Sequence, residues 1–431
     1  MMIAKRLRGW LARASPGVFA GYAIFAAFSV YFCMYAFRKP FTVGVYEGEA
    51  TLPLVGVVSL KILYILAQTL GYCASKFAGI KIVSELPPAR RAAGIVGAIA
   101  CAELALLLFA LVPAPYGALM LVLNGLPLGM VWGLVFGFLE GRRLSDLLGA
   151  GLSASYIVAS GAVKSVGSWA LAWGVDESWM PVFVGMLFAI PLLMAVGLLK
   201  QLPPPSAADE EARTRRLPMD ADARRGFLTR YWVGLAPLVL LYFFLTAYRD
   251  FRDSFAREIW DALGYSEEPS IFATAELPIA FGVVLAVGLL FTIRGNRLAL
   301  VAVYALMGAG AALIGVATLL FESGNLDPAL WMVAVGLGLY LAYVPYGCIL
   351  FDRMIAALGF MATAGFMIYV TDAVGYTGSV ALVLYKNFAQ PELSWLEFFV
   401  TYSYVTSALT AVCFAVSGLY FWRQTRSPSS K

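Results

Sequence analysis

Two adjacent cations, Arg38 and Lys39, interrupt a long apolar stretch near the start of the chain. About 20 mostly apolar residues precede Arg38, and at roughly 1.5 Å per helical residue they approach the thickness of a bilayer's hydrocarbon layer. Apolar residues then resume at Phe41. A helix that continues past Lys39 would place both charges inside the membrane, where each is costly unless it faces a polar cavity or a partner. We therefore expect both cations to have a function there.

An arginine beside tyrosines has the chemistry of an anion-binding surface. Tyr31, Tyr35 and Arg38 are spaced by four and three residues, so in a helix they share one face. A guanidinium group can form paired hydrogen bonds with a phosphate or a carboxylate. The alternative is that the tyrosines pack as ordinary aromatic residues and the arginine extends toward the membrane surface.

The second half of the chain repeats this pattern. Arg249 follows about 18 mostly apolar residues, a depth similar to that of Arg38, and shares a helical face with Asp253. Arg252 lies on another face of the same helix and is a second substrate-binding candidate. Alternatively, this charge-dense segment is a solvated helix end in which neighbouring acids neutralise the arginines.

Further polar and ionisable residues fall within apolar runs, where they need a partner or a cavity. Lys164 follows Ser160 by one helical turn and could instead form a salt bridge, and Lys76 could extend toward the cytoplasm. The remaining substrate-binding candidates among these residues are Lys76, Lys164 and Ser160. The gating or proton-coupling candidates are Glu276, Asp372 and Asp253.

Several classes of protein are disfavoured by the composition. The sequence has no histidine, no paired nucleophile and base, no phosphate-cradling loop and no metal-ligand spacing, so we expect no enzyme, no metal site and no cofactor. The net charge of +5 comes from cations scattered between apolar runs, which does not indicate a nucleic-acid partner. The five cysteines fall in apolar stretches and are expected to be small buried residues.

The overall composition is that of a multi-pass membrane protein. Hydrophobic residues make up 61% of the 431 residues, charged residues 13%, and the mean hydropathy is +0.80. We expect an all-α membrane protein of about twelve spans, found from apolar windows of about 19 residues. The expected spans are 17–45, 53–80, 92–112, 117–139, 149–174, 179–200, 231–257, 269–293, 298–321, 329–351, 360–386 and 396–422.

The loops predict the orientation and the domains. Arginine and lysine concentrate in alternate loops, which places both termini in the cytoplasm. The longest polar segment, 201–230, is expected to be a cytoplasmic linker between two six-helix bundles. Two such bundles commonly form a transporter with its site at their interface. The expected division is an N-terminal cytoplasmic segment 1–16, a bundle 17–200, the linker 201–230, a bundle 231–422 and a tail 423–431.

The residues resemble those of a known family. The six-plus-six division looks like the major facilitator superfamily, and the tyrosine-rich run ending in Arg38-Lys39 is similar to the first helix of organophosphate:phosphate antiporters such as the bacterial glycerol-phosphate transporter. Further similar residues are Tyr72-x-x-Ser75-Lys76-Phe77, Gly129-Met130-x-Trp132, Arg249, Glu276, Arg294-Gly295-Asn296-Arg297 and Gly375-Tyr376-x-Gly378-Ser379-Val380.

The resemblance implies a phosphate-binding role for two arginines. Arg38 and Arg249 would hold the substrate phosphate, and the residues that would assist them or line the path are Lys39, Lys76, Tyr31, Tyr35 and Tyr376. The sequence also departs from the family pattern, because Ser160 stands where a histidine is expected on the fifth helix. Substrate identity and phosphate exchange therefore do not follow from the resemblance alone.

These observations favour a secondary active transporter of a small organic anion, with a phosphorylated anion as the leading substrate class and inorganic phosphate as a candidate counter-substrate. Rocker-switch alternating access would follow if a bound anion drew two mutually repelling arginines together. The alternatives are a proton-coupled carrier of a carboxylate or neutral solute, and a transport-incompetent anion sensor. We expect a monomer in the bilayer of a cell membrane, with the bacterial cytoplasmic membrane as the favoured location.

Overall fold

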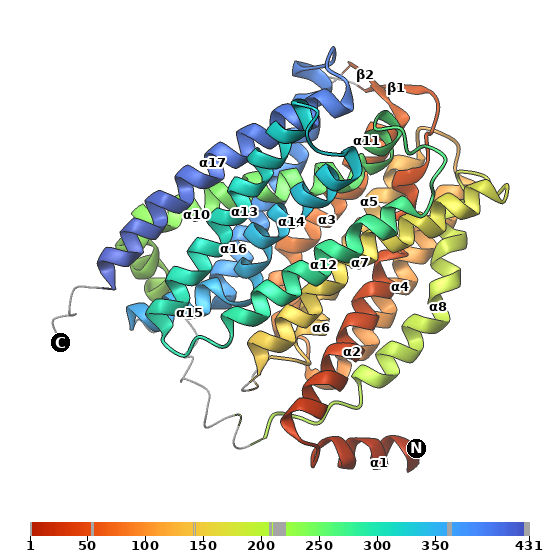
Figure 1. The fold of residues 1–431 in the computed structure, drawn as a ribbon. Helices are drawn as coiled ribbons and strands as arrows, with labels where there is room; N and C mark the ends of the chain where they lie inside the picture. The colour runs from red at the N-terminus through yellow and green to blue at the C-terminus, as the bar shows by residue number, and fades with distance from the viewer. Residues whose placement is uncertain are drawn as a thin grey trace. The chain divides into compact units, whose positions relative to one another are not determined.

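The computed structural model is helical throughout, apart from one short β-hairpin (Figure 1). It describes residues 2–52, 56–140, 142, 144–206, 209, 221–359 and 364–425. The chain forms two compact units, and each is described separately below. Unit 1 comprises Met1–Ala212, Asp253–Leu277 and Val383–Ala389, and unit 2 comprises Arg213–Arg252, Pro278–Leu382 and Gln390–Lys431.

Unit 1 is built mainly from long apolar helices. Helix α2 packs against α7 and α8, and α5 packs against both α3 and α4. The described elements are α1 (Met2–Leu11), α2 (Pro16–Tyr35), the 3-10 helix η1 (Pro40–Val43), β1 (Glu49–Leu52), β2 (Gly56–Ser59), α3 (Leu60–Glu85), α4 (Pro88–Leu111), α5 (Gly117–Leu128), α6 (Val131–Phe136), α7 (Ser145–Ala172), α8 (Met180–Leu199), α11 (Ala256–Ala262) and the π-helix η2 (Tyr385–Ala389).

Unit 2 contains the remaining helices, and α13 packs against α14, α15 and α17. Its elements are α10 (Ala221–Ser254), α12 (Ile271–Leu290), α13 (Asn296–Glu322), α14 (Pro328–Cys348), α15 (Leu350–Leu358), α16 (Ala364–Leu384) and α17 (Trp395–Gln424). The last residues of α10, the first residues of α12 and the last residues of α16 belong to unit 1.

The helices establish a multi-pass membrane protein. Ten helices in the described part of the chain are long and apolar enough to cross a bilayer. Helices α3 and α16, with 26 and 21 residues, lie where two further spans are expected but are not among those ten. The structure therefore supports ten of the twelve predicted spans.

The expectation that the first helix runs through Arg38 and Lys39 is wrong. Helix α2 ends at Tyr35, whose carbonyl oxygen accepts hydrogen bonds from the backbone N–H groups of both Arg38 (3.0 Å) and Lys39 (2.9 Å). Pro40 explains the break, because proline has no N–H to donate to the carbonyl of Ala36 and its ring would clash with that carbonyl in a continuing helix. The chain turns at residues 36–39 and continues as η1, so the two cations lie on a buried turn.

The second span begins later than expected, because a hairpin occupies its first residues. Strands β1 and β2 pair antiparallel, with Glu49 opposite Ser59 and Leu52 opposite Gly56. Helix α3 then starts at Leu60, where the Ser59 hydroxyl accepts a hydrogen bond from the N–H of Ile62. The apolar, β-branched residues of the hairpin resemble a membrane span by composition alone.

Two other expected spans are interrupted. The span 117–139 is divided into α5 and α6 after Pro127, and the span 329–351 is divided into α14 and α15 at Ile349, after Pro345. A proline inside a helix removes one backbone hydrogen bond and distorts the turn before it. Helix α10 begins at Ala221, inside the expected linker, whereas residues 207–208, 210–220 and 426–431 of the expected linker and tail lie outside the described residues. Cys101 is exposed, contrary to expectation, and the other four cysteines are buried.

Glycines bring α3 and α5 into direct backbone contact. A Cβ atom on Gly71 would lie 2.1 Å from the carbonyl oxygen of Val122, and one on Gly125 would lie 2.4 Å from that of Gln68. Small residues permit this close approach between membrane helices. The contact fixes the part of α3 that carries Tyr72.

Candidate functional site

The turn after α2 places Arg38 against an aromatic ring of α3. The Cζ atom of Arg38 lies 3.6 Å from the ring centroid of Tyr72 and 5.9 Å from that of Tyr35. The Lys76 ammonium lies 5.3 Å from the Tyr72 ring. Two cations therefore share one tyrosine ring, each attracted by its π-system. Tyr31 stacks edge-on against Tyr35 at 5.6 Å, as expected for residues on one helical face.

A buried asparagine holds the backbone next to Arg38. The Asn124 side chain, fully buried on α5, donates hydrogen bonds to the carbonyl oxygen of Phe37 (2.9 Å) and to that of Ala102 on α4 (3.0 Å). The Phe37 carbonyl lies beyond the end of α2 and therefore has no partner inside that helix. Asn124 thus ties the turn that carries Arg38 to α4 and α5.

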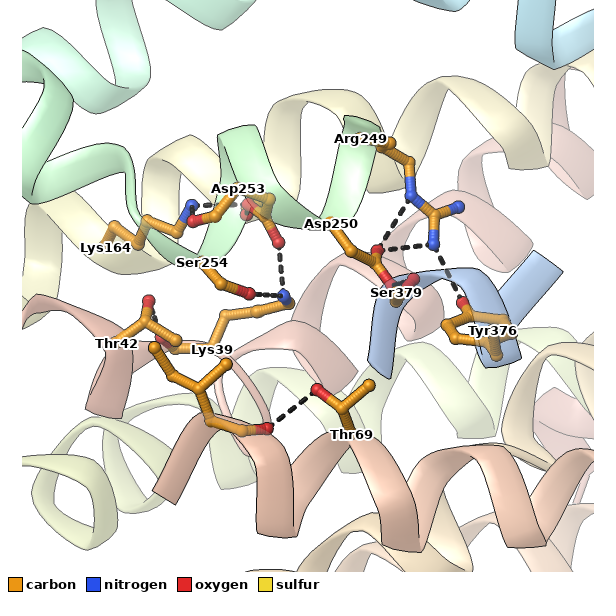
Figure 2. Close-up of polar contacts among 12 residues, drawn as sticks. Lys39, Thr42, Thr69, Lys164, Arg249, Asp250, Asp253, Ser254, Tyr376 and Ser379 are labelled. Atoms are coloured by element: carbon orange, nitrogen blue, oxygen red, sulfur yellow. Dashed lines mark hydrogen bonds and ion pairs between the residues drawn. The ribbon is translucent and has the colours of Figure 1, made fainter. Parts of the chain in front are cut away.

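A second cluster in unit 1 is formed by two lysines and one aspartate (Figure 2). The carboxylate of Asp253 pairs with the ammonium groups of both Lys39 and Lys164. The exposed fractions of the three side chains are 5% for Lys39, 4% for Lys164 and 14% for Asp253. Ser160 donates to the same carboxylate, and Lys39 donates to the Ser254 hydroxyl at 3.5 Å. This confirms the alternative that Lys164 forms a salt bridge.

Cations outnumber carboxylates among the three side chains of this cluster. Two ammonium groups share one carboxylate in a buried environment. Like charges repel more strongly at low dielectric than in water, and a buried charge without full compensation is unfavourable. A bound anion next to the lysines would reduce this cost.

The segment after Lys39 is tied to other parts of unit 1. The Glu177 carboxylate accepts from the backbone N–H groups of Val45 (2.7 Å) and Tyr46 (2.9 Å). Arg257 donates to the carbonyl oxygen of Val43, and Lys61 pairs with Glu258. The position of Lys39 is thus fixed by its ion pair and by the chain that follows it.

In unit 2, Arg249 is surrounded by two tyrosines and an aspartate. Its guanidinium group donates to the Asp250 carboxylate at 2.7 Å and 3.1 Å, to the Tyr376 hydroxyl at 3.0 Å, and to the Tyr343 hydroxyl. Its Cζ atom lies 4.6 Å from the Tyr343 ring centroid. Ser379 donates to the other oxygen of Asp250 at 2.6 Å and fixes the carboxylate (Figure 2).

Arg252 has different surroundings. Its side chain is 5% exposed and donates to the carbonyl oxygen of Met332 on α14 at 3.1 Å. A Cβ atom on Gly336 would lie 2.8 Å from its guanidinium nitrogen. The two arginines thus point to different partners, and Arg249 is the one that contacts the predicted binding residue Tyr376.

The gating and proton-coupling candidates fall in both units. Asp372 of unit 2 accepts a hydrogen bond from the Tyr242 hydroxyl at 2.8 Å, and the Tyr242 ring stacks on Tyr343 at 4.9 Å. Asp372 is therefore linked to Arg249 through two tyrosines. Glu276 of unit 1 packs against Gly161, where an added Cβ atom would lie 2.8 Å from the glutamate Cγ.

Several residues in these clusters were not identified from the sequence. They are Asn124, Ser254, Tyr343 and Ser379. Tyr343 has a sequence signal, because Tyr340, Tyr343 and Tyr346 are spaced by three on α14. Ser379 follows Tyr376 by one turn. Asn124 has no such signal, since a single amide in an apolar helix does not indicate its partner. Within the described ranges, no group of three or more His, Cys, Asp or Glu side chains could hold a metal ion.

A family model matches most of the chain. The model of DUF5690, described as a family of unknown function, matches residues 40–424. The chain belongs to this family. No curated protein matches the sequence. The family match starts at Pro40 and so includes both α3 and the Arg249 cluster, whereas Arg38 and Lys39 precede it.

Solved structures show that this DUF5690 protein has the fold of major facilitator transporters. A D-xylose–proton symporter is 13% identical with a TM-score of 0.63, covering 96% of this chain and 99% of its own. A structure of the major facilitator superfamily proton:xylose symporter XylE with a bound glucose derivative is 13% identical, with a TM-score of 0.57 and coverages of 95% and 96%. The human organic anion transporter MFSD10 is 14% identical, with a TM-score of 0.55 and coverages of 94% and 100%.

Proposed function

We propose that this DUF5690 protein is a secondary active transporter of a small organic anion. Arg38 and Arg249 are the residues proposed to bind the anionic group, and alternating access would move it across the membrane. The observation that carries the proposal is the crowding of cations in unit 1. Arg38 and Lys76 share the Tyr72 ring, and next to Arg38 in the chain Lys39 shares one carboxylate with Lys164.

The chemistry of the side chains favours an anion with several oxygen atoms. Arginine presents a planar set of donors that matches phosphate and carboxylate groups, and lysine adds a point charge. A phosphate group has more oxygen atoms than a carboxylate with which to satisfy Arg38, Lys39 and Lys76 together. We therefore propose a phosphorylated anion as the substrate, and inorganic phosphate as its counter-substrate.

A proton-coupled carrier is the second candidate. Asp372 lies inside an apolar helix and accepts a hydrogen bond from Tyr242, whose ring stacks on the Arg249 partner Tyr343. A carboxyl group that gains and loses a proton at this point could alter the hydrogen bonds around Arg249. The similar structures include xylose–proton symporters, which favours this candidate.

Transport assays in proteoliposomes test both candidates. The purified protein is reconstituted with internal inorganic phosphate, and uptake of labelled phosphate and glycerol 3-phosphate is measured. We expect internal phosphate to stimulate uptake. Arg38→Ala and Arg249→Ala should each weaken substrate affinity by about 100-fold, because a charge-assisted pair of hydrogen bonds contributes roughly 3 kcal/mol. Arg90→Ala, a change at an exposed arginine, is the control and should transport like the wild type.

The alternatives give different results. Uptake that needs a pH gradient, ignores internal phosphate and is lost in Asp372→Asn would support the proton-coupled carrier. Substrate binding without any flux would support an anion sensor. Normal phosphate exchange in both Arg38→Ala and Arg249→Ala would show that the arginines do not bind the substrate.

A further inference from the structure

A long groove lies in unit 2 between α13 and α17, with a volume of about 500 Å³. Small residues form its floor on both helices, namely Gly308 on α13 and Ala411, Ala415 and Gly418 on α17. A Cβ atom on Gly308 would meet no other atom within 4 Å, so the space beside it is open. The missing side chains therefore create the groove.

The groove is apolar along most of its length. The Tyr304 hydroxyl, in its middle, is already paired with the Ser417 hydroxyl at 2.7 Å, and the Thr425 hydroxyl donates to the Phe421 carbonyl oxygen at 2.9 Å. Both hydroxyl groups therefore already have a hydrogen-bond partner. The apolar side chain of Leu419, which lines the groove, is 59% exposed. This composition suits a hydrocarbon chain and not a water-soluble ligand.

One end of the groove carries a cation. The Cζ atom of Arg297 lies 4.4 Å from the ring centroid of Trp422, which fixes the guanidinium group at the first turn of α13 and the last turns of α17. Arg297 is exposed and forms no ion pair with any described residue. Arg294 and Arg423, both exposed, are close to these two residues along the chain. This end of the groove therefore carries the Arg297 cation, and the neighbouring sequence is rich in arginine.

The length of the groove matches one leaflet. Its lining runs from Arg297 to Gly308 on α13, and from Ala411 on α17 to Thr425, the residue after that helix. Eleven steps along α13 at 1.5 Å each give roughly 16 Å, about half of the ~30 Å hydrocarbon thickness of a bilayer. The end that carries Arg297 lies at the start of α13 and the end of α17.

We propose that this groove binds one anionic phospholipid. The phosphate of the headgroup would contact Arg297 beside Trp422, and one acyl chain would lie along Gly308, Ala415 and Gly418. Free phosphate is not the ligand, because most of the groove is apolar and only its end carries a charge. A zwitterionic lipid would bind less tightly, because its headgroup has no net charge to attract the arginines. This site is independent of the transported anion.

Native mass spectrometry and thermal unfolding of the purified full-length protein in detergent test the proposal. The probes are phosphatidylglycerol and phosphatidylcholine of equal chain length, and inorganic phosphate. We expect one tightly bound phosphatidylglycerol and a higher Tm with that lipid than with phosphatidylcholine. Arg297→Ala should weaken phosphatidylglycerol binding by about fivefold, as expected for the loss of one arginine at a membrane surface. Inorganic phosphate should neither displace the lipid nor raise the Tm.

Filling the groove provides a second test. Gly308→Leu and Ala415→Leu should each abolish the lipid-dependent rise in Tm. Gly197→Leu on α8 is the matched control, because a Cβ atom there also meets no other atom within 4 Å. If Gly308→Leu does not fold, the lipid-dependent rise in Tm of Ala415→Leu alone tests the proposal. The proposal is overturned if the variants with a filled groove keep the lipid effect, if Arg297→Ala and the control Arg90→Ala lose equal affinity, or if inorganic phosphate competes with the lipid.

Discussion

The side-chain amide of Asn124 donates a hydrogen bond of 2.9 Å to the carbonyl oxygen of Phe37, the residue that precedes Arg38. The same amide nitrogen donates to Ala102, so one side chain joins three segments of unit 1. A buried carbonyl group outside a helix needs a donor, and Asn124 supplies it. Asn124 therefore helps to hold Arg38 in place through the backbone of the preceding residue.

Replacing Asn124 with leucine, which has a similar volume, should leave the Phe37 carbonyl without its donor. We expect the free energy of unfolding to fall by about 1–3 kcal/mol, the typical cost of an unsatisfied buried polar group. Phosphate affinity should also fall, because the turn that carries Arg38 is released. Thermal unfolding and binding by calorimetry would measure the two effects. An unchanged Tm together with wild-type affinity would contradict this role.

Removing one lysine from the Asp253 cluster should destabilise the protein less than removing the aspartate. Lys164→Met leaves one lysine and one aspartate, a balanced pair, and should be tolerated with a small loss of stability. Asp253→Asn removes the carboxylate that Lys39 and Lys164 share and should cost about 3–5 kcal/mol. Comparing the two Tm values in the same detergent tests the charge balance. An equal loss of Tm in the two variants would show that charge balance does not determine the stability of this cluster.

The contact between α3 and α5 predicts opposite results at two glycines. Gly71→Ala should destabilise unit 1, because the added Cβ atom would lie 2.1 Å from the carbonyl oxygen of Val122. Gly97→Ala on α4 meets no atom within 4 Å and should raise stability by about 0.5–1 kcal/mol through helix propensity. Thermal unfolding of both variants distinguishes packing from propensity. A stabilised Gly71→Ala variant would show that the helices separate easily.

The loop before α8 predicts a pH dependence outside the membrane spans. The Ser178 hydroxyl and its backbone N–H (2.8 Å) donate to the Asp176 carboxylate and lower its pKa below the ordinary value. Because the pKa is lower in the folded state, the contribution to stability is present above the unfolded pKa of about 3.9 and is lost as the pH falls through the folded pKa. The difference in Tm between wild type and Asp176→Asn should therefore shrink below about pH 4. A difference in Tm that stays constant over this pH range would contradict the prediction.

Much of the fold could be predicted from the sequence because each span carries its own signal. The length of the apolar run identifies α8 and α13 individually, because each membrane-spanning helix must by itself be long enough to cross the bilayer. The breaks at Tyr35 and Ile349 were missed, although Pro40 and Pro345 mark them, because hydropathy averaged over a window does not register a backbone break. The hairpin Glu49–Ser59 was missed for a related reason, as its apolar residues continue into α3.

The site was predictable only to a limited extent, because it depends on pairs of distant residues. Helical spacing placed Tyr31 with Tyr35, the depth of Arg249 in its apolar run made it a candidate, and the family resemblance implied Tyr376. No local pattern connects Lys39 to Asp253 or Asn124 to Phe37. Such pairs are set by the tertiary packing of helices. The side chains of Ser160 and Lys164 were identified one turn apart, yet their common partner became visible only in the structure.

The Lys39 cluster also has a consequence for the order of synthesis. Lys39 is made early in the chain, and its hydrogen-bond partner Ser254 is made 215 residues later. Lys164 precedes Asp253 by 89 residues. At ribosomal rates of about 5–20 residues per second, the first lysine waits for a time on the order of 10 s or longer. During that interval Asp253, which pairs with both lysines, does not yet exist, so this cluster can form only after the end of α10 has been synthesised.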